Sequence, residues 1–155
     1  MKPYADSIVF TAVHLQLENT AAALTLLEEL RMSRSSPLPV TRLIQMEFAN
    51  ALQRLVFEAR KGNQRLRITP EHALLAEDAF HEELQLGGVS LESPLAVESL
   101  AANFEMLAHR HTAKWGFRTY DILHVASALA LGCDTFWTFD AKAKKLAQLE
   151  GLATN

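Results

Sequence analysis

Residues 119–140, TYDILHVASALALGCDTFWTFD, decide the fold that this sequence predicts. Asp121–Leu131 is a helical run that a glycine closes. Thr135–Phe139 is apolar and aromatic, which is typical of a buried strand, and Ala141–Glu150 is a further helical run. A helix, a buried strand and a second helix in succession indicate an α/β domain.

The rest of the chain repeats this alternation. Short strands are predicted at Tyr4–Phe10, at Val40 and at Val89–Leu91. Helices are predicted at Ala21–Leu30, from Thr41 to Arg60, from Thr69-Pro70 to Leu86 and from Ser93-Pro94 to Trp115. At 155 residues the chain is long enough for one domain. We therefore predict a single domain over 1–155, a three-layer α/β/α sandwich with a central, largely parallel sheet.

The composition excludes several classes of protein. The formal net charge of −3 argues against a histone-like basic binder, and a single cysteine excludes an internal disulfide framework and a cysteine-rich zinc module. The apolar run from Ile8 to Val13 is too short for a signal peptide and follows Asp6. No stretch approaches the ~20 apolar residues of a membrane span. These features predict a soluble, cytoplasmic protein with no membrane partner.

Charge is distributed unevenly along the chain. Residues 31–70 contain eight Lys and Arg against two Glu, whereas residues 71–105 contain eight Asp and Glu and no Lys or Arg. A locally basic segment can bind a phosphate backbone in a protein that is acidic overall. The same pattern is also typical of ordinary solvated helix faces, and the acidic segment is unlike a nucleic-acid surface.

Four acids are candidate site residues. Asp6, Asp121 and Asp140 lie where predicted strands or helices begin or end, and Glu47 lies on the flank of the predicted helix from Thr41 to Arg60. In parallel α/β sheets, the carboxyl ends of the strands and the turns that follow them form the site. Carboxylates that converge there repel one another unless a cation or protons are present. Oxygen ligands without His or Cys select Mg²⁺ or Mn²⁺ over zinc.

Each acid also has a purely structural explanation. Asp140 precedes a helix and could be only an N-cap, and Asp121 could simply complement the helix dipole. Glu47 could be a solvated side chain on its helix. Asp6 is the hardest to explain in this way, because Asp is disfavoured in strands and its surroundings are apolar.

The segments that carry these acids resemble the acidic motifs of the PIN-domain family, and most closely its small, single-domain VapC-type toxins. They are Tyr4-Ala5-Asp6-Ser7, Met46-Glu47-Phe48, Thr119–Ala126 and Thr138-Phe139-Asp140. The resemblance covers nearly the whole chain in order and spacing. It implies an α/β/α sandwich and metal-dependent cleavage of RNA, with the toxin–antitoxin role as the expected setting.

By position, the resemblance implies that Asp6, Glu47, Asp121 and Asp140 form a site for Mg²⁺ or Mn²⁺, with Asp6 and Asp121 as direct ligands. Ser7 and Thr138 match positions that hold small polar residues beside the acids. An RNA substrate, an antitoxin protein and a homodimer are the implied partners. The family usually has one more strand after the last helix, and only residues 151–155 remain for it here.

Other side chains receive secondary predictions. Arg42, Arg118 and Lys142 are candidates to hold phosphates. His124 follows Asp121 by one turn and is expected to be buried beside the site, whereas His109 and His111 are expected at the surface. Packing in the core is expected for Cys133 and for the aromatic residues Trp115, Phe136, Trp137 and Phe139.

Two other functions compete with the ribonuclease. The first is a PIN-like RNA-binding or scaffold module without turnover, which has no physical need to keep four acids together. The second is a phosphotransferase of the haloacid dehalogenase type. That mechanism needs a second acid two positions after Asp6, where this chain has Ile8.

Overall fold

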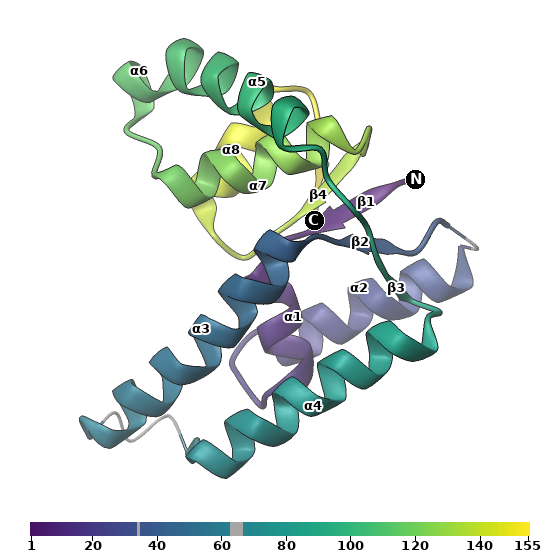
Figure 1. The fold of residues 1–155 in the computed structure, drawn as a ribbon, viewed down its shortest axis with the longest axis vertical. Coiled ribbons are helices and arrows are strands. Elements are labelled where there is room, and N and C mark those ends of the chain that lie inside the picture. Colours follow the sequence, from purple (N-terminus) through teal and green to yellow (C-terminus); the bar gives the residue numbers. More distant parts are fainter. Residues whose placement is uncertain (34, 63–66) are drawn as a thin grey trace.

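The computed structural model describes residues 1–33, 35–62 and 67–155. The strands lie in a central layer, with α1 to α4 on one side and α5 to α8 on the other (Figure 1). This arrangement confirms the predicted α/β/α sandwich. The described residues do not include Arg34 and Arg65 of the basic segment, nor Asn63, which follows the predicted end of the helix at Arg60.

Within the described residues, five short strands make up the central layer: β1 (Pro3–Ala5), β2 (Leu38–Val40), β3 (Ser90–Glu92), β4 (Thr135–Trp137) and β5 (Ala153–Thr154). One sheet has the order β1-β4-β5 and the other pairs β2 with β3, and every pairing is parallel. β5 follows the last helix and has two residues, in the short segment 151–155 that the sequence leaves for a final strand. Because β1 and β4 are adjacent and parallel, Asp6 and Thr138 leave the sheet at the same edge.

The helices before β3 are α1 (Ser7–His14), α2 (Thr20–Met32), α3 (Arg42–Arg60) and α4 (Pro70–Leu86). Those after it are α5 (Val97–Leu107), a π-helical turn (Ala108–Thr112), α6 (Ala113–Trp115), α7 (Thr119–Ala130) and α8 (Ala141–Leu149). The predicted caps of α3 and α4 are confirmed, since the side chains of Thr41 and Thr69 accept from backbone N–H groups of the first turn. No helix within the described residues is both long enough and apolar enough to cross a membrane.

The predicted strand Tyr4–Phe10 was wrong beyond Ala5. Helix α1 begins at Ser7, and the Asp6 carboxylate caps it by accepting from the backbone N–H groups of Ile8 and Val9. The β-branched residues of this segment favour a strand, but the cap and the burial of one helix face outweigh that propensity. Asp6 is therefore not a strand residue, which removes the anomaly noted in the sequence.

The prediction that Ser93-Pro94 opens a helix was also wrong. The Ser93 N–H donates to the Val40 carbonyl and its hydroxyl donates to the Leu91 carbonyl, so Ser93 ends the β3 pairing instead of capping a helix. Helix α5 begins later, at Val97.

The core packs against both sides of the sheet. Tyr4 of β1 and Phe136 of the adjacent β4 stack with ring centroids 5.7 Å apart. Trp137 and Cys133 are buried as predicted, and Phe139 packs partly buried against the same core. Trp115 was wrongly predicted as a core residue, because its ring is 41% exposed and lies beneath Lys114 and Lys145.

The two histidines expected at the surface differ. His109 is exposed as predicted, but His111 is buried and its Nε2 lies 2.6 Å from the Glu150 carboxylate at the end of α8. The π-helical turn brings about this contact, because it rotates His111 away from the surface and against Phe117.

Candidate active site

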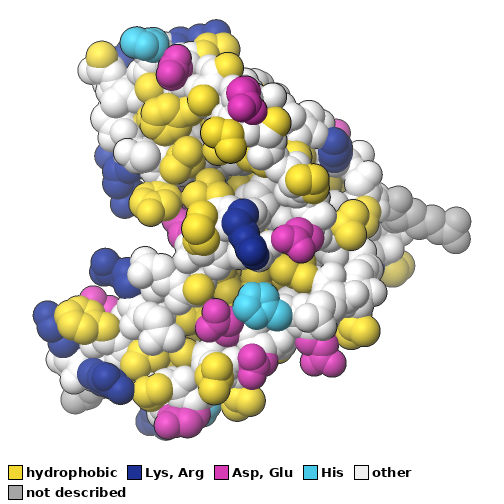
Figure 2. Space-filling view, viewed as in Figure 1, with side chains coloured by type: hydrophobic (Ala, Val, Ile, Leu, Met, Phe, Trp, Pro, Cys, Tyr) yellow, Lys and Arg dark blue, Asp and Glu magenta, His cyan; other side chains and the backbone are white. Residues whose placement is uncertain are grey.

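All four predicted acids line one cleft of about 490 Å³. The cleft lies where the start of α1, the flank of α3, the start of α7 and the start of α8 meet, and its lining includes Asp6, Ser7, Glu47, Arg54, Arg118, Asp121, His124 and Asp140. In the space-filling view the molecule is hollowed between its upper and lower halves, with Lys or Arg side chains on both margins (Figure 2). The fold thus brings together residues that are up to 134 positions apart in the sequence.

Asp6 is the most deeply placed of the acids. It is 3% exposed, and its Oδ1 accepts from the N–H groups of Ile8 and Val9 at 3.1 and 3.3 Å. Its Oδ2 accepts a hydrogen bond from the Thr138 hydroxyl. Burial raises the pKa of Asp6 to about 6, against the lowering effects of His124 and Thr138. A buried carboxylate that is reluctant to ionise gains most from a nearby cation.

Thr138 connects Asp6 to Asp140. Its hydroxyl donates to Asp6 and accepts from the backbone N–H of Asp140 at 2.9 Å. Asp140 Oδ1 accepts from the N–H groups of Lys142 and Ala143, so Asp140 is the N-cap of α8. Its second oxygen accepts from Arg118 on the cleft side. Asp140 is therefore both the N-cap of α8 and a residue of the cleft.

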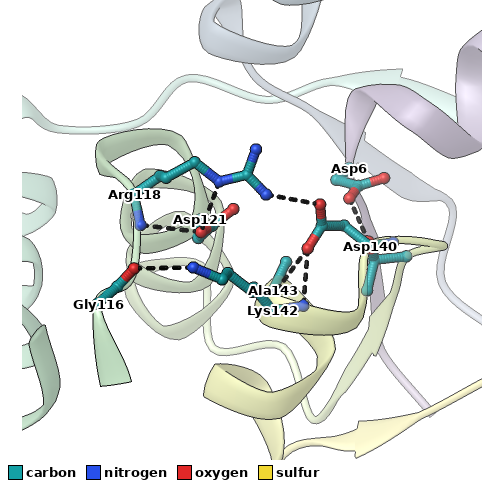
Figure 3. Close-up of polar contacts among 8 residues, drawn as sticks. Asp6, Gly116, Arg118, Asp121, Asp140, Lys142 and Ala143 are labelled. Carbon is teal, nitrogen blue, oxygen red and sulfur yellow. Dashed lines mark hydrogen bonds and ion pairs between the residues drawn. The ribbon is translucent and has the colours of Figure 1, made fainter. Parts of the chain in front are cut away.

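Arg118 lies between Asp121 and Asp140 (Figure 3). Its Nη2 is 3.0 Å from Asp140 Oδ2, and its Nε is 3.5 Å from Asp121 Oδ2. Its backbone N–H donates to the same Asp121 oxygen at 2.9 Å, which fixes the start of α7. The guanidinium thereby offsets part of the repulsion between the two acids in this conformation. Arg118 itself is 64% exposed and reaches the acids from the rim of the cleft.

Glu47 enters the cleft from α3 and contacts His124 of α7. Burial alone would raise the pKa of Glu47, but the hydrogen bond and charge of His124, together with the Ser7 hydroxyl, outweigh it and lower this pKa. The Glu47 carboxylate is therefore held in its ionised form. The other nitrogen of His124, Nδ1, lies 3.0 Å from the Tyr4 hydroxyl.

The side chains that line the cleft offer the type of ligand atom that a hard divalent cation binds, namely oxygen. Both nitrogens of His124 already have polar partners, which leaves oxygen atoms, those of the four carboxylates foremost, to coordinate a cation in the cleft. Carboxylate oxygens are the ligands that Mg²⁺ and Mn²⁺ prefer. In this conformation no three His, Cys, Asp or Glu side chains of the described residues are close enough together to hold a metal ion. The acids share a cleft, and their side chains would have to turn inward to share a cation.

Of the three basic residues predicted to hold phosphates, only Arg118 lines the cleft. Arg42 instead donates to Gln45 at 2.6 Å, and Lys142 donates to the Gly116 carbonyl at 3.2 Å. Arg54 also lines the cleft, from α3, and was not among the residues predicted from the sequence. Its position was readable from the sequence, because a residue seven positions after Glu47 lies on the same face of a helix.

The PIN domain family model matches residues 4–149 of the chain. The chain therefore belongs to the PIN domain family. Among curated proteins, none has a sequence that matches the chain significantly.

Two solved structures share the fold at low sequence identity. VapC20 of Mycobacterium tuberculosis, described as a sarcin-ricin loop cleaving toxin, superposes with a TM-score of 0.61 at 14% identity over 92% of this chain and 93% of its own. FitAcB of Neisseria gonorrhoeae superposes with a TM-score of 0.59 at 16% identity over 98% of this chain and 95% of its own. Both superpositions cover almost the full length of the two chains compared.

Proposed function

We propose that this PIN protein is a metal-dependent ribonuclease that hydrolyses RNA phosphodiester bonds. The observation that carries the proposal is the convergence of Asp6, Glu47, Asp121 and Asp140, from four separate elements, on one cleft. Four carboxylates in one cleft are electrostatically unfavourable without a cation. A cation-binding catalytic role therefore explains their arrangement better than an RNA-binding or scaffold role without turnover does.

Mg²⁺ or Mn²⁺ would be held by Asp6 and Asp121, with Glu47 and Asp140 binding directly or through water. Such an ion, when bound, polarises a phosphoryl oxygen, activates a water molecule and neutralises charge on the leaving oxygen. The chain's own residues supply the positions of the carboxylates. Thr138 fixes Asp6, the first turn of α8 fixes Asp140, and the backbone of Arg118 fixes Asp121.

Basic side chains at the rim favour a nucleic-acid substrate. Arg54 and Arg118 come from opposite sides of the cleft, α3 and the segment before α7. Each can contact a phosphate of a strand that crosses the carboxylates, and the guanidinium of Arg118 can turn from Asp140 towards that phosphate. The acidic surface of α4 would repel a polyanion, so we expect the strand to stay between α3 and α7.

A toxin role, restrained by an antitoxin protein, is the physiological setting that we propose. The structural similarity to a VapC toxin supports it, and a homodimer in the cytoplasm is the form that we expect. Expression of the chain without a partner should slow growth, and Asp121→Asn should relieve the effect. Harmless expression of folded, active protein would favour an RNA-processing role instead.

The reaction itself is tested by incubating the purified protein with labelled single-stranded RNA. Cleavage is expected with Mn²⁺ or Mg²⁺ and should stop when EDTA is added. If the protein binds the RNA but never cleaves it with either metal, the chain is a PIN-like binding or scaffold module. Full activity in EDTA would contradict the role proposed for the acids.

A further inference from the structure

His124 is a buried residue with a polar partner at each ring nitrogen. It lies on α7, one turn after Asp121, and is 4% exposed. Its Nε2 contacts Oε2 of Glu47 on α3, and its Nδ1 lies 3.0 Å from the hydroxyl of Tyr4 on β1. The ring therefore connects the central sheet to an acid of the cleft that comes from the opposite helical layer.

The contacts determine what each partner can do. A carboxylate only accepts hydrogen bonds, so Nε2 of His124 is the donor in its contact with Glu47. Tyr4 is completely buried, and burial raises its pKa far above the usual range, so its hydroxyl keeps its proton. That hydroxyl lies 3.0 Å from Nδ1, on the other side of the ring. The three groups therefore form a continuous hydrogen-bonded chain, from Tyr4 through His124 to Glu47.

We propose that His124 is a positioning residue that holds the Glu47 carboxylate for cation binding, with Tyr4 fixing the ring from its other side. The inference rests on the proposed function only in taking Glu47 as one of the cation's ligands. A carboxylate accepts at both oxygens, so holding Oε2 leaves Oε1 for the cation. Without His124, the side chain of Glu47 would be free to turn towards solvent, because it is only partly buried.

Hydrogen bonds that orient a ligating carboxylate typically change metal affinity by ~10–100-fold when they are removed. His124→Leu removes the donor to Glu47 and fills the space of the ring with a side chain that forms no hydrogen bonds. His124→Gln places a side-chain amide there that can still donate to Glu47. His109→Leu changes an exposed histidine outside the cleft and serves as the matched control.

The first measurement is the protonation of the ring nitrogens, read by NMR of the ¹⁵N-histidine-labelled, metal-free protein. The His124 resonances are assigned by their loss in His124→Gln. We expect a proton on Nε2, which faces Glu47, and Tyr4→Phe should shift the Nδ1 resonance because it removes the hydrogen-bond partner of that nitrogen. An unprotonated Nε2, or an Nδ1 resonance that does not respond to Tyr4→Phe, would overturn the proposal.

The second measurement is the affinity for Mn²⁺ alone, determined by calorimetry on variants whose near-ultraviolet circular dichroism matches the wild type. His124→Leu should bind at least ~10-fold more weakly. His124→Gln should recover most of this loss, and His109→Leu should bind as the wild type does. Wild-type affinity in folded His124→Leu would overturn the proposal. If the wild type binds no Mn²⁺, the metal site of the proposed function fails, while the NMR result still decides whether Tyr4 and His124 orient Glu47.

Discussion

The Thr138 hydroxyl donates a hydrogen bond to the Asp6 carboxylate across the adjacent parallel strands β1 and β4. Both residues lie just beyond the ends of their strands, and both are buried. The same hydroxyl accepts from the N–H of Asp140. One side chain therefore sets the relative positions of two acids that are far apart in the sequence.

Thr138→Val should destabilise the metal-free protein. Valine has nearly the shape of threonine but leaves the Asp6 oxygen and the Asp140 N–H without their partner, a loss of ~2 kcal/mol for two hydrogen bonds. For a chain of this size, that corresponds to a fall in the melting temperature of roughly 4–8 °C. Thr138→Ser keeps the hydroxyl and is the control. If thermal unfolding gives the same midpoint for both variants, the two hydrogen bonds do not hold the acids in place.

The stability of the metal-free protein should depend on pH through Asp6. Its pKa is about 6 in the folded chain against 3.8 as the ordinary value, so the fold favours the protonated form. The stability that this group contributes is fully present below pH 3.8 and is lost as pH rises through 6. Asp6→Asn resembles the protonated acid and can still cap α1. We therefore expect the variant to melt near the wild type at pH 4 and above it at pH 8.

The measurement for Asp6 is the difference in melting temperature between Asp6→Asn and the wild type, recorded in EDTA from pH 4 to pH 8. A difference that stays constant would mean that Asp6 does not titrate in this range. A variant that loses stability against the wild type as pH rises would show that the fold favours the ionised carboxylate as a hydrogen-bond acceptor.

Mn²⁺ should raise the melting temperature of the wild type. A ligand that binds only the folded state stabilises it by ~2.7 kcal/mol at 100 times its dissociation constant, which is roughly 5–10 °C here. Asp121→Asn should show a much smaller rise, because it removes one charge of the site. Glu105→Gln, an exposed acid on α5, should respond as the wild type does. Equal rises in all three proteins would indicate non-specific binding of the ion.

Arg54→Ala should weaken the binding of single-stranded RNA and reduce its salt dependence. Each phosphate contact contributes ~0.7 to the slope of log affinity against log salt concentration for single strands, so one contact less should lower the slope by about that amount. The experiment uses an Asp121→Asn background, in which turnover is not expected. Arg31→Ala is the control, since Arg31 also pairs with a glutamate on its own helix but lies outside the cleft. An unchanged slope for Arg54→Ala would place the RNA elsewhere.

Much of the fold could be predicted because the relevant signals are local. Thr41 and Thr69-Pro70 mark helix starts by capping chemistry alone, and both helices begin where predicted. The first strand could not be delimited, since the β-branched residues after Asp6 favour a strand, and the Asp6 cap together with burial in the completed fold makes them helical. The Ser93-Pro94 signal was likewise overridden by the fold, because the Ser93 N–H donates to the carbonyl of Val40 instead of starting a helix.

Asp6, Asp121 and Asp140 could be selected from their positions at the ends of elements, and Glu47 from its place on a helix flank, but the partners of the acids could not. The contact between Glu47 and His124 joins residues 77 positions apart on two helices, and no local spacing signals it. The pairing of Arg118 with Asp140 depends in the same way on how α7 and α8 pack. Arg54 is the exception, since it shares a helix face with Glu47 and could have been found by periodicity.

The most direct test of the account is the rate of RNA cleavage in Mn²⁺ for single substitutions of the four acids, Asp6→Asn, Glu47→Gln, Asp121→Asn and Asp140→Asn. Asp134→Asn, an acid outside the cleft, is measured beside them. We expect Asp6→Asn and Asp121→Asn to abolish cleavage, the other two cleft variants to reduce it strongly, and Asp134→Asn to leave it unchanged. Undiminished cleavage by folded Asp6→Asn and Asp121→Asn would contradict the claim that these acids form the catalytic centre.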